Sequence, residues 1–268
     1  MDILERLRAE RVRGASWYLE ELLRALEAVD RPDEAAEAAR AIRPGMASLD
    51  VAALAVAEAA KAGVAPKAAV RRLREYIEEA KARLGEVIEE FDLRCPARLI
   101  TVSFSRAVSD FIRRRRSCIE VVYLAESRPG EEAAAALADY GSYVEVVPIP
   151  DAAVGALSAD YAISGLDGFY RDGYMFNKVG TLPLFAAARA LGLETIAVFE
   201  SYKMAPVNSP QPYRVEQEVL GRRVEVPLFD KFRADLVDVA LTDLGPSRPD
   251  VSLIDSAWRR ILAKVKSP

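Results

Sequence analysis

Apolar residues recur at helical spacing through the first third of the chain. In the segment YLEELLRAL, for example, the leucines are spaced so that they share one helix face. Prolines and glycines interrupt the pattern, and such residues commonly mark helix ends. Ser48 is positioned to cap one of these helices. The pattern predicts helices over residues 3–28, 33–41, 48–62, 66–82 and 83–91.

From about residue 97, short apolar runs alternate with helical stretches. The runs cover residues 98–102, 119–124, 143–147, 161–164, 195–199 and 237–242. The helical stretches cover residues 105–115, 130–140, 151–157 and 181–191. Strands that alternate with helices pair in parallel, so this pattern predicts an open sheet covered on both faces. Ligands of such sheets bind beyond the carboxyl ends of the strands.

The last quarter of the chain is less regular. The segment EQEVLGRRVEV predicts a hairpin that turns at Leu220-Gly221, and residues 246–268 contain a final helix. The whole pattern predicts an α/β protein with two domains. Residues 1–95 form a helical N-terminal domain, and residues 96–268 form a parallel-sheet domain that carries the ligand pocket.

Composition removes several kinds of chemistry. The chain has 268 residues, of which 51% are hydrophobic and 29% are charged, enough apolar material for a sizeable core. It contains no histidine, which excludes Ser-His-Asp and Cys-His nucleophile systems and His-ligated metals. Acid–base chemistry must therefore use Asp, Glu, Lys, Tyr or Cys.

The cysteine count and the N-terminal sequence indicate a cytoplasmic protein. The two cysteines, Cys95 and Cys118, are too few for a disulfide framework or a four-cysteine zinc site, and we interpret them as free thiols. No secretion signal and no run of 18 apolar residues is present, so we expect no membrane association. A net charge of −4 argues against direct nucleic-acid binding. Neither GxGxxG nor GxxxxGK[ST] occurs, so we expect no NAD, FAD or Walker-type ATP cofactor. We also expect no metal, because the candidate site residues need no metal constellation.

The strongest cluster of candidate site residues is GLDGFYRDGYMFNKVGT, which follows the fourth predicted strand. Asp167 lies where that strand ends, and Asn177 and Lys178 precede a helix that begins at Gly180-Thr181. Because a helix start attracts anions, these residues predict a phosphate site. The alternative is an ordinary turn between a strand and a helix.

Hydroxyl and basic residues follow three other strands. Ser103 and Ser105 lie after the first strand, where they bind a phosphate or only cap the next helix. Arg128 follows the second strand and either grips a phosphate or lies in solvent. Lys203 follows the fifth predicted strand and is a further candidate phosphate ligand.

Arginines beside glycine or proline mark the helical part. Arg13-Gly14 and Arg43 are positioned to close over the strand ends. Together, these groups predict a site for a small phosphorylated polyol.

Taken in order, these segments resemble the family of initiation factor 2B alpha, beta and delta subunits and the related sugar-phosphate isomerases. The isomerases include ribose-1,5-bisphosphate isomerase and methylthioribose-1-phosphate isomerase. The motifs are RGAS at 13–16, RPGMASL at 43–49, ESRP at 126–129, DAAVG at 151–155, GLDG at 165–168, NKVGT at 177–181, SYK at 201–203 and TDLG at 242–245. The resemblance implies a helical N-terminal domain, a Rossmann-like C-terminal domain, and assembly as a dimer or larger.

The resemblance also implies which residues carry the isomerase reaction. The family's catalytic Asp falls on Asp167, but its Thr-His-Cys motif reads Thr101-Val102-Ser103 here. A serine hydroxyl has a far higher pKa than a thiol and is poorly suited to move protons without a base. We therefore predict an archaeal regulatory protein of the alpha type, a homodimer that binds a phosphorylated sugar or nucleotide and has a translation-factor partner. The alternative is an aldose–ketose isomerase in which Asp167 is the acid–base group and Ser103 a hydrogen-bond donor.

Overall fold

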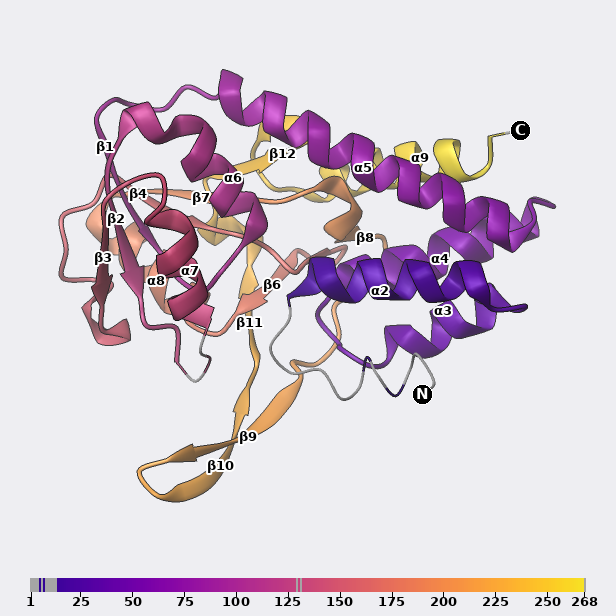
Figure 1. The fold of residues 1–268 in the computed structure, drawn as a ribbon, viewed down its shortest axis with the longest axis horizontal. Helices are drawn as coiled ribbons and strands as arrows, with labels where there is room; N and C mark the ends of the chain where they lie inside the picture. Colours follow the sequence, from indigo (N-terminus) through magenta and orange to yellow (C-terminus); the bar gives the residue numbers. More distant parts are fainter. Residues whose placement is uncertain (1–4, 6, 8–13, 129, 131, 268) are drawn as a thin grey trace.

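A helical layer occupies one side of the molecule (Figure 1). The computed structural model describes residues 5, 7, 14–128, 130 and 132–267. The layer's helices are α2 (Ala15–Ala28), α3 (Pro32–Arg40), α4 (Ala47–Lys61) and α5 (Pro66–Glu90). The last helix of the chain, α9 (Val251–Val265), lies along α5 and contributes Ile261 and Val265 to the same core.

Two details of the helical prediction are corrected. The two helices expected over 66–82 and 83–91 are the single helix α5, which continues through Gly85. A β-carbon at Gly85 would lie 2.6 Å from Nη2 of Arg114, so the absence of a side chain at this position allows the Arg114 guanidinium to pack against the helix. Ser48 caps nothing, because α4 begins one residue earlier and takes Met46 as its N-cap. Most of the predicted extension of the first helix before residue 14 lies outside the described residues.

Seven strands form the main sheet in the order β13-β12-β7-β4-β1-β2-β3. Their bounds are β1 (Ala97–Thr101), β2 (Ile119–Ala125), β3 (Val146–Ile149), β4 (Tyr161–Ser164), β7 (Glu194–Val198), β12 (Val239–Thr242) and β13 (Gly245–Ser247). All neighbours pair in parallel except β12 and β13. Five of the six predicted strands are confirmed near their expected bounds, whereas the third was expected over 143–147 and forms over Val146–Ile149. The chain first builds outward from β1 through β2 to β3 and then crosses to β4 on the other side of β1, which creates a switch point between β1 and β4.

Helices cover both faces of this sheet. On one face lie α6 (Arg106–Arg115), α7 (Glu132–Tyr140) and the end of α5, and on the other lie α8 (Thr181–Leu191) and the start of α9. The helix predicted over 151–157 is wrong. Only the single turn η2 (Asp151–Ala153) forms there, and the carboxylate of Asp151 accepts hydrogen bonds from the loop after β2.

Two smaller sheets complete the fold. The sheet β11-β6-β5-β8 was not predicted, and its strands are β5 (Gly168–Tyr170), β6 (Tyr174–Lys178), β8 (Met204–Ala205) and β11 (Phe229–Arg233). The predicted hairpin is confirmed as β9 (Arg214–Val219) and β10 (Arg222–Pro227), and it projects from the body of the molecule (Figure 1). Leu220 and Gly221 form its turn with φ of 51° and 74°.

The cysteines are not free thiols, which corrects the prediction from composition. Cys95 and Cys118 form a disulfide with their Cα atoms 4.8 Å apart. They meet because β1 and β2 are parallel neighbours and Ala97 pairs with Ile119 at the start of both strands. The bond therefore ties the segment that leaves α5 to the entrance of β2.

Within the described part of the chain, no helix is both long and apolar enough to cross a membrane.

Candidate functional site

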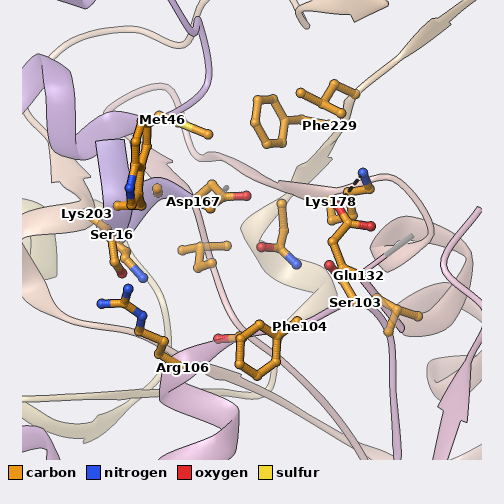
Figure 2. A pocket seen from close by; sticks show the side chains of 18 of the residues that line it. Ser16, Met46, Ser103, Phe104, Arg106, Glu132, Asp167, Lys178, Lys203 and Phe229 are labelled. Atoms are coloured by element: carbon orange, nitrogen blue, oxygen red, sulfur yellow. Dashed lines mark ion pairs between the residues drawn. The ribbon is translucent and has the colours of Figure 1, made fainter. Parts of the chain in front are cut away.

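A cavity of about 500 Å³ opens beyond the carboxyl ends of β1 and β4, at the switch point of the sheet (Figure 2). Such a crevice is where open α/β sheets bind their ligands. The cavity brings together most of the residues selected from the sequence. Its lining includes Gly14, Ser103, Ser105, Asp167, Asn177, Lys178 and Lys203.

Asp167 is fixed in the cavity by its backbone. Its N–H donates to the carbonyl of Phe176 at 2.9 Å, and its own carbonyl accepts from the N–H of Ala47 at 3.0 Å. Gly168 permits this docking, since a β-carbon there would lie 2.7 Å from the carbonyl oxygen of Gly45. The RPGMASL segment thus acts as a support that holds the GLDG turn in place.

Burial changes the acidity of Asp167. Loss of hydration raises the pKa of its carboxyl group to about 6. The charges of Lys203 and Lys178 lower the pKa, and the charge of Glu132 raises it. A carboxyl group that titrates near neutrality is suited to bind hydroxyl groups as an anion and also to exchange a proton.

Two buried lysines provide positive charge. Lys178 is 8% exposed and Lys203 is 5% exposed. The Nζ atom of Lys178 lies 2.7 Å from Glu132 Oε1, and that of Lys203 lies 3.0 Å from Glu200 Oε2. A buried ammonium group needs such a partner. Both cations therefore reach the cavity from within an ion pair.

The loop after β1 presents Ser103 in an unusual backbone conformation. Ser103 has a φ of 61°, in the left-handed region that residues other than glycine rarely adopt. Its N–H donates to Ser127 Oγ at 2.5 Å, and that hydroxyl donates to the carbonyl of Ala125 at 2.9 Å. Strained conformations of this kind cluster at binding and catalytic sites.

Two other predicted residues, Ser105 and Asn177, also make hydrogen bonds within the protein. Ser105 Oγ accepts from the N–H of Val108 at 3.4 Å and caps α6, the simpler of the two roles expected for it. The amide nitrogen of Asn177 donates to Ser164 Oγ at 2.8 Å and to Thr181 Oγ1 at 2.9 Å. Both amide protons are thereby used inside the protein, which leaves the carbonyl oxygen of Asn177 to meet a ligand.

The start of α8 is not an open anion site. Oδ2 of Asp230 accepts from the N–H groups of Gly180 at 2.9 Å and Leu182 at 2.8 Å. The negative charge predicted at this helix start is therefore supplied by the protein itself.

Two of the three predicted arginines, Arg43 and Arg128, are absent from the cavity lining. Arg43 is buried, donates from Nε to the Tyr18 hydroxyl at 2.9 Å and lies over the ring of Tyr213. Arg128 is exposed, and its backbone N–H donates to Asp151 Oδ2 at 2.8 Å. Arg13 lies outside the described residues.

Several cavity residues were missed in the sequence. They are Ala15, Ser16, Trp17, Met46, Val102, Phe104, Arg106, Glu132, Ala135, Leu166, Leu228 and Phe229. Ser16 and Met46 lie within the motifs already selected, so their position was a usable signal. Leu228 and Phe229 follow the hairpin, and nothing in the local sequence placed that segment beside β1 and β4.

Known proteins of this architecture are similar to the chain over most of its length. A putative translation initiation factor eIF-2B subunit 2-like protein of Pyrococcus horikoshii is 30% identical over 91% of this chain and 95% of its own. A ribose 1,5-bisphosphate isomerase of Archaeoglobus fulgidus is 28% identical over 69% of this chain and 65% of its own. The crystal structure of the P. horikoshii translation initiation factor eIF-2B superposes with a TM-score of 0.81 at 27% identity, covering 94% of this chain and 97% of the other.

The model of the initiation factor 2 subunit family matches residues 16–249. This match spans the helical layer, the main sheet and the cavity between them. The chain therefore belongs to the initiation factor 2 subunit family.

Proposed function

We propose that this protein binds a small phosphorylated sugar or nucleotide in the cavity and that its isomerase chemistry is weak or lost. The observation that carries the proposal is the pairing of buried cations with a central carboxylate at the switch point of the sheet. Lys203 and Lys178 lie on either side of Asp167 (Figure 2). Cations suit a phosphate, and a carboxylate suits the hydroxyl groups of a sugar.

The phosphate fits best beside the start of α2. Gly14, Ala15 and Ser16 line the cavity there, and no side chain among the described residues caps this helix. Lys203 and Arg106 lie on the same side of the cavity (Figure 2). Free N–H groups of a helix start beside two cations favour a phosphate.

Ser103 is the reason to favour binding over turnover. It occupies the position of the catalytic cysteine in the isomerases that the sequence resembles, and its hydroxyl is a poor acid–base group at neutral pH. A regulatory role of the alpha type, assembly as a homodimer and a translation-factor partner follow from kinship with the family. They belong to the same proposal.

Titration calorimetry tests the binding claim. We expect heat of binding with ribose 5-phosphate, ribose 1,5-bisphosphate or a nucleoside monophosphate. Lys203→Met removes a charge-assisted contact and should weaken binding at least about tenfold. The matched control is Lys67→Met, because Lys67 is exposed and is not part of the cavity lining. Absence of binding by every compound would remove the proposal.

One observation favours a second function, that of an aldose–ketose isomerase. The carboxyl group of Asp167 has a pKa of about 6, which suits a group that exchanges protons with substrate near neutral pH. Turnover of ribose 1,5-bisphosphate or 5-methylthioribose 1-phosphate, abolished by Asp167→Asn, would establish this function. Binding without turnover would support the regulatory one.

A further inference from the structure

Glu132 is a cavity residue for which the proposed function has no role. It is the first residue of α7, and its Oε1 atom lies 2.7 Å from Nζ of Lys178. Its Oε2 atom is buried and has no hydrogen-bond partner among the described residues. A buried carboxylate oxygen without a donor is costly, so this atom is suited to accept a hydrogen bond from a ligand.

The two lysines of the cavity differ in where their partners lie. Glu132 lines the cavity together with Lys178, whereas Glu200, the partner of Lys203, is absent from the lining. A ligand beside Lys178 therefore also meets the Glu132 carboxylate. A ligand beside Lys203 does not contact the carboxylate of that ion pair, because Glu200 lies outside the lining.

The pair formed by Glu132 and Lys178 is packed tightly against the backbone. A β-carbon at Gly130 would lie 1.8 Å from Glu132 Oε2 and 2.7 Å from Lys178 Nζ. Both charged groups thus rest against a residue that has no side chain. A side chain at position 130 would therefore displace the ion pair.

The cavity consequently has two unlike ends. Figure 2 shows Lys203, Ser16 and Arg106 on one side and Lys178, Glu132 and Ser103 on the other, with Asp167 between them. The first side carries two cations, Lys203 and Arg106, whose ion-pair partners Glu200 and Glu20 lie outside the lining. The second side carries no net charge, because the Glu132 carboxylate cancels the Lys178 ammonium.

On the basis of the proposed function, we propose that Glu132 is a specificity-determining residue of this site. It cancels the charge of Lys178 and accepts a hydrogen bond from a ligand hydroxyl group through Oε2. The site therefore selects sugars that carry a phosphate at one end and hydroxyl groups at the other. Sugars phosphorylated at both ends are disfavoured, since the second phosphate would lie against the Glu132 carboxylate.

The test compares ribose 5-phosphate with ribose 1,5-bisphosphate by titration calorimetry on the full chain. We expect the wild-type protein to bind ribose 5-phosphate at least as tightly as the bisphosphate. Glu132→Gln keeps the shape of the side chain and removes its charge. It should tighten binding of the bisphosphate about tenfold and change binding of the monophosphate by less than about threefold.

Glu126→Gln is the matched control, because it removes the same charge from an exposed position outside the lining at the end of β2. It should leave the ratio of the two affinities unchanged. Glu132→Ser is a second variant, since serine is well tolerated at a helix start. Thermal denaturation verifies that each variant folds, and Glu132→Ser should shift the ratio in the same direction as Glu132→Gln.

The outcomes separate this inference from the proposed function. Binding of both sugars with one ratio in the wild-type protein and both Glu132 variants would overturn the role of Glu132 and leave the site intact. Absence of binding in the wild-type protein and in all variants would overturn the proposed function, and the role of Glu132 with it.

Discussion

Two aspartates hold strand-end loops in the two halves of the main sheet, but in different surroundings. Asp151 follows β3 and accepts from the N–H groups of Ser127 and Arg128 at 2.7 and 2.8 Å. Asp243 follows β12 and accepts from the N–H and Oγ of Ser201 at 2.6 and 2.8 Å. The hydrogen bonds are alike, yet Asp243 is 6% exposed whereas Asp151 is half-buried.

This difference shows how the two halves are stabilised. Ser201 also bonds the hydroxyl of Tyr76 in α5 at 2.7 Å, so the network of Asp243 is buried and ties the sheet to the helical layer. Burial raises the pKa of Asp243 to about 6. The half that contains Asp151 instead relies on partly exposed bonds at one end and the disulfide at the other. Four predictions test this comparison, in order from the largest to the smallest expected change in stability.

Removing the disulfide should have the largest effect. The double variant Cys95→Ser/Cys118→Ser opens a link across 23 residues and should lower the free energy of unfolding by about 3 kcal/mol. Urea unfolding without reductant measures the change. Reductant should destabilise the wild-type protein by a similar amount and leave the double variant unaffected. A variant as stable as the wild-type protein would show that the disulfide does not stabilise this half.

Truncating the aspartates compares the two halves directly. Asp243→Ala leaves buried donors of Ser201 without an acceptor and should cost about 2 kcal/mol. Asp151→Ala leaves donors that water reaches more readily, and should cost about 1 kcal/mol. Both values come from urea unfolding of the single variants. Equal losses would contradict the view that burial distinguishes the two aspartates.

A close backbone contact between Gly168 and Gly45 also stabilises the half of the sheet that contains β4, and this contact does not involve Asp243. Gly168→Ala places a β-carbon 2.7 Å from the Gly45 carbonyl oxygen and should cost about 1.5 kcal/mol through overpacking. Gly155→Ala is the control, because its β-carbon would meet Ala187 at an ordinary 3.5 Å. If thermal unfolding finds the two variants equally stable, the docking of the GLDG turn is not close-packed.

The smallest effect is the pH response of Asp243. Since its pKa is raised to about 6, the folded protein binds a proton as pH falls through 6 while the unfolded chain does so only near 4. Stability from this group should therefore rise by about 0.8 kcal/mol between pH 7 and pH 5.5. The measurement is the difference in stability between the wild-type protein and Asp243→Asn at both values. A difference that does not change with pH would contradict the raised pKa.

The sequence predicted the main sheet well because each buried strand is a short apolar run between polar segments. It predicted α8 to the residue, since Gly180 and Gly192 bound that helix. The small sheet was missed because strands of two to five residues leave little periodicity. The disulfide was missed because the sequence does not show which strands are neighbours, and the pairing of β1 with β2 is what brings Cys95 beside Cys118.

Site residues were predicted where the backbone alone decides their position. Asp167 and Ser103 follow strands directly, so the topology carries them to the cavity. Arg43 and Arg128 were predicted as site residues only because they follow or adjoin selected segments of the sequence. The direction of a side chain depends on tertiary contacts, and the side chain of Arg43 points to the rings of Tyr18 and Tyr213. Glu132 gave no signal, because an acidic residue at a helix start is common.

The walls of the cavity come from segments as distant in the sequence as Gly14 and Phe229. A partly folded chain therefore has no cavity, and binding is coupled to completion of the whole fold. By mass action, a ligand at one hundred times its dissociation constant would stabilise the folded protein by about 2.7 kcal/mol. Any compound that binds in the cavity should therefore raise the melting temperature of the protein. Thermal denaturation can thus be used to screen phosphorylated metabolites for a ligand.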